Sequence, residues 1–314
     1  MVFTILIHKN RALSTYLSTM NPQIKKHFAI TVHYGDPAPT NRTVQSLLQN
    51  NDPPDFIIVI NHGPTGLSLK TNPRLVQLNP PNNAGYAAGI NMGLGVISTL
   101  QASPSDIITC LNNDVIVPRD TFTKLRQWWS DYPDNILLGL TVHQPNQPPQ
   151  LSGQVNLLTG RCRLTNIALP THQNRHLFTL PYIHGACFSA PLNLLLLNHG
   201  LPSEYFMYWE DVLFSQQTMR RHLPLRTASN ITVIHDEESS DSAASTKKTY
   251  YLVRNGALFL ERETFWPWRC YWWIANRLRY AYHRLRRRHP VVIQALRDAI
   301  NRTTGPAPMP LSNY

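Results

Sequence analysis

Short hydrophobic runs alternate with segments of helical periodicity along the first 111 residues. The hydrophobic runs are 28–34, 56–60, 74–78 and 106–111. Each has the length and composition of a buried strand, and 40–49 and 84–100 between them have helical spacing. Uninterrupted apolar strands separated by helices indicate a parallel sheet covered on both faces. Because ligands bind such sheets at the carboxyl ends of the strands, we expect the chemistry in the loops that follow these runs.

The remainder of the chain has a less regular pattern. In order, we predict strands near 136–142 and 151–158, helices at 191–198 and 210–221, a strand at 230–235, a mobile loop at 239–245, and helices at 246–264 and within 265–289. The expected organisation is an N-terminal extension (1–27), an α/β domain (28–264) and a basic, aromatic helical segment with a tail (265–314).

Composition narrows the class of protein. The chain has 314 residues, of which 42% are hydrophobic and 15% charged, so it can bury a large core and is not globally disordered. Its four cysteines are scattered, which argues against a disulfide framework or a zinc site and fits a reducing compartment. We find no signal peptide and no run of about 18 apolar residues, so we expect a cytoplasmic protein. The net charge of +11 favours anionic partners, and the excess lies near the C-terminus.

Two glycine- and asparagine-rich segments carry candidate chemistry. In NNAGYAAGINMG (82–93), Gly85 and Gly89 would let a helix N-terminus approach a phosphate, or would simply let the helix pack closely on the sheet. In LNNDV (111–115), Asp114 follows a strand and suits a hard cation that bridges to a diphosphate. Asn-Asp is also common turn chemistry, which is the structural explanation of this segment.

Two further segments contribute acids and a histidine. Glu210 and Asp211 begin a helix after the apolar run FMYW, which would desolvate a carboxylate and raise its pKa toward the range of a general base. Acids at a helix N-terminus also complement the macrodipole, and this alone would explain one of them. His235 ends a strand, where it could complete a metal site or serve the structure alone.

Taken in order, these segments resemble family 2 of the inverting glycosyltransferases, and within it the bacterial rhamnosyltransferase-like branch. The resemblance extends over about residues 29–261 and rests on TVHY, the helix at 40–48, FIIVIN, N-x-G-Y-A-A-G-x-N-x-G, LNNDV, GACFSAP, YFMYWEDVLF, VIH and YLVRNG. It implies the GT-A fold, a Rossmann-like mostly parallel sheet with helices on both faces. It also implies transfer of a sugar from a nucleotide-diphosphate donor with inversion of the anomeric centre.

The resemblance assigns a role to each motif residue. Asp211 would be the catalytic base, and Glu210 would help to position the acceptor. Asp114 and His235 would bind Mg²⁺ or Mn²⁺, which neutralises the diphosphate as the bond breaks. Tyr208 and Trp209 would stack on an acceptor sugar. The donor site would comprise His33, Asn61, Asn83, Gly85, Gly89, Asn91, Asn113 and Arg254.

Two departures from the family pattern leave alternatives open. Ile60 stands where an Asp that touches the nucleotide is common, and the metal-binding triplet Asn112-Asn113-Asp114 has one acid. The resemblance implies that the donor would be a dTDP-sugar, such as dTDP-rhamnose, or a UDP-sugar. The expected acceptor is a cell-surface polysaccharide or a lipid-linked glycan. The alternative is a catalytically silent relative that binds a glycan or scaffolds a membrane complex. A nucleotidyltransferase would need an early basic phosphate-binding signature, which we do not find.

The segment 265–289 has seven Arg and no acid, interleaved with Trp and Tyr. As a helix it would align one face, formed by Tyr271, Ile274, Leu278, Ala281 and Leu285. This composition is typical of a helix on an anionic membrane surface, although the same face could pack on the main domain. No recognition motif supports nucleic-acid binding. We therefore expect a peripheral protein on the inner face of the cell membrane.

Overall fold

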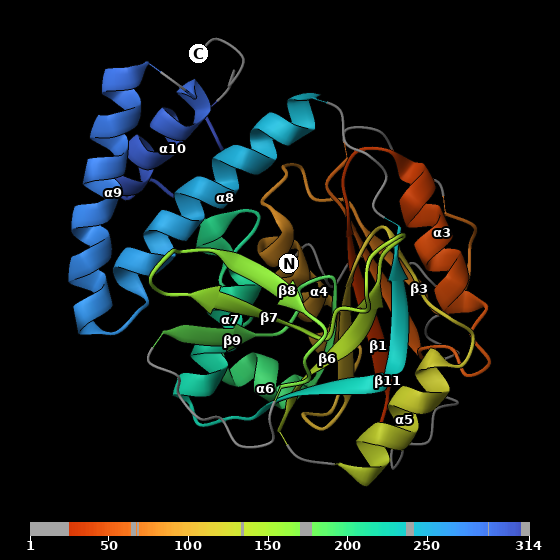
Figure 1. Ribbon diagram of the computed structural model, residues 1–314. Helices are drawn as coiled ribbons and strands as arrows, with labels where there is room; N and C mark the ends of the chain where they lie inside the picture. Colours follow the sequence, from red (N-terminus) through yellow and green to blue (C-terminus); the bar gives the residue numbers. More distant parts are fainter. Residues whose placement is uncertain are drawn as a thin grey trace.

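An eight-stranded sheet forms the centre of the molecule (Figure 1). The structure is a computed structural model that describes residues 25–63, 67, 69–132, 135–169, 178–236, 242–287 and 289–308. Residues 1–24 of the predicted N-terminal extension, and 239–241 of the predicted mobile loop, lie outside the described residues.

The strand order of this sheet is β3-β2-β1-β4-β10-β6-β11-β5. The strands are β1 (His27–His33), β2 (Phe56–Asn61), β3 (Leu75–Leu78), β4 (Ile107–Asn112), β5 (Val115–Ile116), β6 (Leu137–His143), β10 (Cys187–Pro191) and β11 (Leu225–His235). The first four strands along the chain are parallel, as are β6 and β11. Strand β10 is antiparallel to β4 and β6, and β5 is antiparallel to β11. The sheet is therefore mixed but mostly parallel.

Helices cover both faces of the sheet because alternate residues of its strands point in opposite directions. In β2, Ile58 and Ile60 pack in one core cluster with α4 (Tyr86–Ser98), α6 (Leu192–Leu197) and α7 (Glu210–Arg220). Ile57 and Val59 pack in a second cluster with α3 (Pro37–Leu48) and α5 (Thr121–Asp131), which lie together on the other side of the sheet (Figure 1). This arrangement confirms the predicted α/β fold class.

The C-terminal helices join the domain through a second, smaller sheet. This antiparallel sheet contains β7 (Ser152–Asn156), β8 (Cys162–Thr165) and β9 (Thr179–Tyr182). Beside it lie α8 (Ser242–Arg262), α9 (Trp266–Arg286) and α10 (Pro290–Ile300), which pack against one another at the left of Figure 1. A third core cluster joins Val155 and Leu157 to Phe259 and Trp272, so these helices share a core with the small sheet.

The predicted elements of the first 111 residues are confirmed, with small shifts at their ends. Several later elements were not predicted, among them α5, β8, β9, β10 and α10. The predicted strand at 230–235 is the second half of β11, which begins at Leu225. The predicted loop at 239–245 needs correction, because α8 already begins at Ser242.

Candidate active site

A cavity of about 670 Å³ opens at the carboxyl ends of the central strands. Its lining comes from the ends of β1 and β4, the turn before α4, the segment before β10, the loop before α7, the end of β11, and α8. Loops after all four hydrophobic runs contribute to it, as expected from a parallel sheet. Of the predicted site residues, nine line this cavity: Asn83, Gly85, Asn113, Asp114, Tyr208, Trp209, Glu210, Asp211 and His235.

The two acids of the cavity lie in the first turn of α7. Oδ1 of Asp211 accepts a hydrogen bond from the N–H of Val212 (2.8 Å), and Oδ2 accepts one from the N–H of Gly185 (3.1 Å). Burial raises the pKa of Asp211 to about 6. Burial, and secondarily the neighbouring charge of Asp211, raises the pKa of Glu210 to about 8. Two adjacent carboxyl groups with such pKa values can share a proton near neutral pH, which suits acid–base chemistry.

Gly185 lets the backbone approach the Asp211 carboxylate. A Cβ atom at this position would lie 2.9 Å from Oδ2 of Asp211 and 3.0 Å from its Cβ. Any side chain at this position would therefore push against Asp211 and weaken the hydrogen bond from the N–H of Gly185.

The loop that precedes the acids has a strained backbone. Phe206, Tyr208 and Trp209 have positive φ angles of 64°, 64° and 73°, which residues other than glycine rarely adopt. Such strain costs about 1–3 kcal/mol per residue and persists only where the surroundings impose it. Trp209 is 6% exposed, and its Nε1 donates to the carbonyl of Leu252 (3.1 Å). The predicted acceptor residue Trp209 is therefore mainly a packing contact with α8.

Asn255 and Arg254 of α8 hold this loop. Nδ2 of Asn255 donates to the carbonyls of Tyr205 (2.9 Å), Met207 (2.7 Å) and Tyr208 (3.0 Å). Nη2 of Arg254 donates to the carbonyl of Tyr205 (3.2 Å), and both side chains are fully buried. Arg254, a predicted donor-binding residue, does not line the cavity but positions the loop that does.

The turn before α4 supports the same loop from the opposite side. The N–H of Tyr86 donates to the carbonyl of Phe206 (3.0 Å). Gly85 has φ 91°, and a Cβ atom there would lie 2.2 Å from that carbonyl oxygen. Asn83 accepts a hydrogen bond from the N–H of Gly85 (2.9 Å). At least two N–H groups of this helix start are thus already used by the protein itself. Donor binding by this segment stays a prediction.

Asp114 and His235 contact each other within the cavity. Asp114 follows β4, and His235 is the last residue of β11. Nε2 of His235 lies 3.0 Å from Oδ1 of Asp114, and Nδ1 lies 3.0 Å from Nε2 of Gln144. The fold thus brings together the two residues predicted to bind metal.

A directional chain of hydrogen bonds determines the tautomer of His235. The N–H of Ala186 donates to Nδ1 of His184 (3.0 Å), so His184 carries its proton on Nε2 and donates it to Oε1 of Gln150 (3.0 Å). Nε2 of Gln150 donates to Oε1 of Gln144 (3.0 Å), whose Nε2 donates to Nδ1 of His235. His235 therefore carries its proton on Nε2, facing Asp114. Burial, and secondarily His235, lowers the pKa of His184 to about 4, which keeps His184 neutral.

Two predicted donor residues at the ends of β1 and β2 are engaged in local hydrogen bonds instead of lining the cavity. His33 is fully buried, and its Nδ1 forms a hydrogen bond with Oγ1 of Thr40 (2.7 Å). Nδ2 of Asn61 donates to Oδ1 of Asn79 (2.9 Å). Both side chains shape the loops beneath the cavity.

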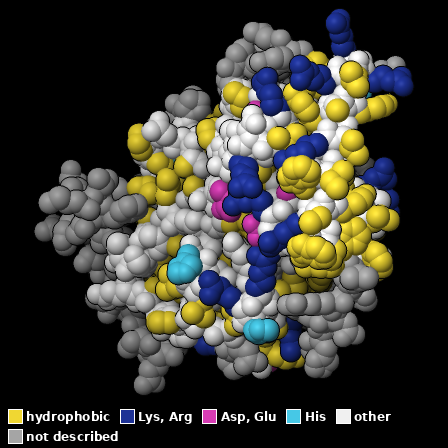
Figure 2. Space-filling model, turned by 90° about the vertical axis from the view of Figure 1, so that its left-hand side faces the viewer, with side chains coloured by type: hydrophobic (Ala, Val, Ile, Leu, Met, Phe, Trp, Pro, Cys, Tyr) yellow, Lys and Arg dark blue, Asp and Glu magenta, His cyan; other side chains and the backbone are white. Residues whose placement is uncertain are grey.

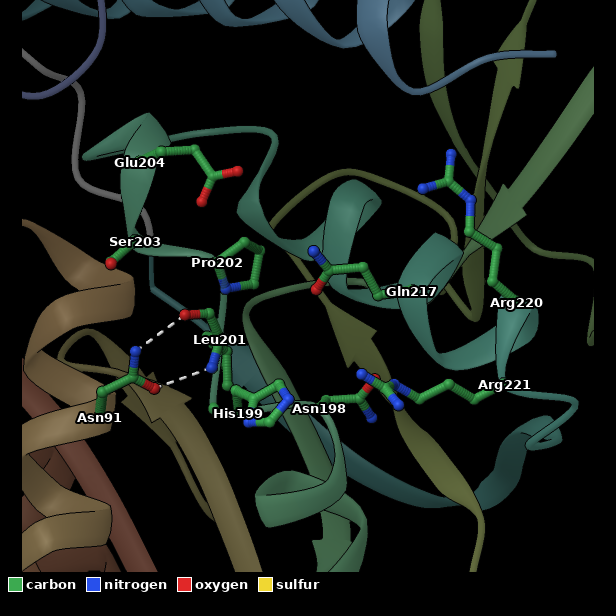
Figure 3. A pocket seen from close by; sticks show the side chains of 11 residues that line it. Asn91, Asn198, His199, Leu201, Pro202, Ser203, Glu204, Gln217, Arg220 and Arg221 are labelled. Atoms are coloured by element: carbon green, nitrogen blue, oxygen red, sulfur yellow. Dashed lines mark hydrogen bonds between the residues drawn. The ribbon is translucent and has the colours of Figure 1, made fainter.

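Two further predicted donor residues lie on α4 but outside the cavity. Gly89 allows α4 to pack against β1, since a Cβ atom there would lie 2.7 Å from Cγ2 of Val32. Asn91 faces a second, smaller pocket of about 450 Å³, where its side chain accepts from and donates to the backbone of Leu201 (both 2.8 Å; Figure 3). Its amide therefore fastens the segment after α6 to α4.

Several cavity residues were not predicted from the sequence. These are chiefly His62, Gln144, Tyr182, His184, Lys247, Lys248 and Tyr251. His184 directly precedes the GACFSAP motif, so extending that motif by one residue would have found it. Gln144 lies in the irregular middle of the chain and carries no local signal. Lys247 and Lys248 belong to a correctly predicted helix, but the sequence does not show which side of that helix faces the cavity.

No protein-family model matches the chain, and no curated protein matches it. Solved structures are similar to it in fold. GalNAc-T7 with UDP, GalNAc and Mn²⁺ is 11% identical, with a TM-score of 0.54 over 77% of this chain and 51% of that chain. TarS 1–349 from S. aureus in complex with UDP-GlcNAc is 14% identical, with a TM-score of 0.49 over 88% of this chain and 81% of that chain.

The protein has the GT-A glycosyltransferase fold. At this level of identity the similarity to GalNAc-T7 shows the fold alone, and this chain spans about half the length of that structure. The assignment to family 2 and to its rhamnosyltransferase-like branch stays a prediction.

Proposed function

We propose that the protein is a metal-dependent inverting glycosyltransferase that moves a sugar from a nucleotide-diphosphate donor to a glycan or lipid-linked acceptor. One observation carries the proposal: a single cavity contains two pairs of functional groups. These are the partly buried acids Glu210 and Asp211, and the carboxylate of Asp114 after β4, which contacts His235. These are the two functional groups that such a transfer needs on opposite sides of the sugar.

Asp211 is the proposed base. Its carboxylate is held by the N–H groups of Gly185 and Val212, so its position is fixed before an acceptor binds. A carboxylate with a pKa near 6 is ionised at neutral pH, yet basic enough to take a proton from the attacking hydroxyl. Because one base assists one displacement, the anomeric configuration is inverted. Glu210, with the higher pKa, stays protonated and can donate a hydrogen bond to the acceptor.

The cavity suits a cation held mainly by the substrate. Among the described residues there is no group of three His, Cys, Asp or Glu side chains that could enclose a metal ion. Mg²⁺ is commonly held by one or two carboxylates together with substrate phosphates and water, and Asp114 provides such a carboxylate. When bound, the cation would neutralise the diphosphate leaving group. Asp114 would hold it, and His235 contacts the same carboxylate.

The donor is proposed to be a UDP- or dTDP-sugar, with rhamnose as the sugar expected from the branch resemblance. GalNAc-T7 was solved with UDP, GalNAc and Mn²⁺, which supports a nucleotide-sugar donor in this fold. A thermal-shift screen of UDP, dTDP and GDP, each with and without Mn²⁺, tests this proposal. A ligand at about 100 times its dissociation constant adds about 2.7 kcal/mol of stability, which is readily measured. Absence of any shift would favour the silent-scaffold alternative.

Substitution of the base tests the catalytic part of the proposal. We expect Asp211→Asn to lower turnover by about 10²–10⁴-fold, the usual contribution of a general base, while nucleotide binding persists. Asp120→Asn is the matched control, because Asp120 is an exposed acid paired with Lys124 outside the cavity. Normal turnover by Asp211→Asn would refute the assignment of the base.

A further inference from the structure

Helix α9 exposes a continuous apolar face. Tyr271, Ile274, Leu278 and Leu285 are 42%, 53%, 65% and 85% exposed, and they recur at intervals of three, four and seven residues. This is the face that the sequence predicts. The hydroxyl of Tyr271 donates to the carbonyl of Leu158 (3.1 Å), whereas Ile274, Leu278 and Leu285 are more than half exposed. Most of this face therefore does not pack on the main domain.

The opposite face of α9 fixes the helix on the protein. Trp272 is 3% exposed, and its Nε1 donates to the carbonyl of Leu157 (2.7 Å). Asn276 is fully buried and donates to Oε1 of Glu261 (2.9 Å). The apolar face therefore points outward from a firmly packed helix and is not the inner face of a helix that has swung away.

Aromatic and basic side chains border this apolar face. Trp273 is 54% exposed and stacks under the guanidinium of Arg277, which lies 4.0 Å from the ring centroid. Arg284, Arg286 and Arg287 are exposed and form no ion pair with any described acid. Figure 2, which views the molecule from this side, shows hydrophobic and basic side chains next to one another over a broad surface.

We propose that this surface of α9 docks on an anionic lipid bilayer. A bilayer surface accommodates apolar, aromatic and basic side chains together, because acyl chains, the interface and anionic headgroups lie within a few ångströms of one another. A second copy of this chain is a poorer partner, since it would bring the same unpaired arginines face to face. Among the described residues no helix is long and apolar enough to cross a membrane. Because the opposite face of α9 packs on the protein, this helix would lie along the bilayer surface.

The same helices connect this surface to the cavity. Helices α9 and α10 pack on α8, whose Lys247, Lys248 and Tyr251 line the cavity. The hydroxyl of Tyr251 accepts a hydrogen bond from the N–H of Ala307 (2.7 Å), so the segment after α10 forms part of the cavity wall. Docking would thus hold the cavity near the bilayer, which favours a lipid-linked acceptor. This last step rests on the proposed function, whereas the docking itself does not.

Vesicle sedimentation tests the docking without any turnover. The full chain is mixed with vesicles of phosphatidylcholine alone or of phosphatidylcholine with phosphatidylglycerol, and the bound fraction is measured. We expect preferential binding to the anionic vesicles, weakened by salt. An arginine near such a surface is worth about 1 kcal/mol, so Arg284→Gln/Arg286→Gln/Arg287→Gln should weaken binding by roughly 100-fold.

A second variant and a matched control complete the experiment. Ile274→Ser/Leu278→Ser/Leu285→Ser should also lose binding, while circular dichroism and nucleotide binding stay unchanged. Leu196→Ser/Leu197→Ser removes two similarly exposed leucines of α6 and should bind like the wild type. Equal binding of all variants, or no wild-type preference for anionic vesicles, would overturn the proposal. So would a concentration-dependent dimer that only the α9 apolar variant fails to form.

Discussion

Replacing Asn255 by leucine tests whether α8 imposes the strained conformation of the loop at 206–209. Leucine has a similar volume but no polar group, so the change removes four hydrogen bonds without opening a large cavity. Nδ2 donates three of them, and Oδ1 accepts the fourth from Nε of Arg254 (2.9 Å). The carbonyls of Tyr205, Met207 and Tyr208 each lose the bond from Nδ2 of Asn255. That of Tyr205 keeps the bonds from Arg254 and from the N–H of Met207.

The expected magnitude follows from these contacts. Four hydrogen bonds at roughly 1 kcal/mol each cost about 4 kcal/mol, and leaving the Met207 carbonyl without this donor adds roughly 1–3 kcal/mol. The loop can then relax, and release of strain at one of its three positive-φ residues would return about 1–3 kcal/mol. We therefore expect the free energy of unfolding to fall by about 2–6 kcal/mol, compared with the roughly 5–15 kcal/mol of a domain of ordinary stability. The relaxed loop would also displace Glu210 and Asp211, so turnover should fall further than stability alone explains.

Urea unfolding and turnover, measured on the same samples, separate these two effects. Asn276→Leu is the matched control, because Asn276 is a fully buried asparagine that bonds across the α8–α9 contact, outside the cavity. It should lower stability without changing donor binding or turnover. A loss below about 1 kcal/mol in Asn255→Leu with normal turnover would show that the loop does not depend on this side chain. An equal loss of turnover in both variants would point to general destabilisation.

Two further predictions concern protons in the cavity. Folding raises the pKa of Glu210 from 4.5 to about 8, so the folded state holds a proton that the unfolded state releases between these pH values. The stability of the wild type relative to Glu210→Gln should therefore be greatest below about pH 4.5 and should decline as pH rises through 8. Urea unfolding across this range measures the difference, and a pH-independent difference would show that burial does not raise the pKa of Glu210. Gln150→Leu interrupts the chain that leads to His235, so ¹⁵N shifts of His235 should show both tautomers. Gln147→Leu removes another partner of Gln150 that lies off this chain, and should leave one tautomer.

The strands of the central sheet could be predicted because both of their faces are buried. Residues 56–61 are all buried, so a run without polar interruption was an adequate signal. In the small sheet β7 was predicted, but β8 and β9 had no such signal, because three of the four residues of β8 are exposed and β9 is only partly buried. Helix α10 begins at a proline shortly after α9 ends, and that short break was not apparent in the basic segment.

The candidate site was predictable where a motif residue lies directly in the cavity. Asp114, Glu210, Asp211 and His235 follow this rule, because strand ends and helix starts meet at the carboxyl edge of the sheet. Residues that act through others were harder to interpret. Arg254 was expected to bind the donor because it belongs to a motif, and the sequence contains no sign that its guanidinium is buried against the carbonyl of Tyr205.

The motif before α4 and the motif within α8 both support the backbone of the loop at 206–209. On one side the N–H of Tyr86 donates to the carbonyl of Phe206, and Gly85 leaves room for that carbonyl. On the other side Asn255 donates to the following carbonyls. The loop leads directly into Glu210 and Asp211, so three segments far apart in the sequence jointly determine where the acids lie. A positive φ at three non-glycine residues is costly in isolation and stable only with both supports present. Substitutions in either motif should therefore change catalysis by moving the acid pair, even where the substituted residue touches no substrate.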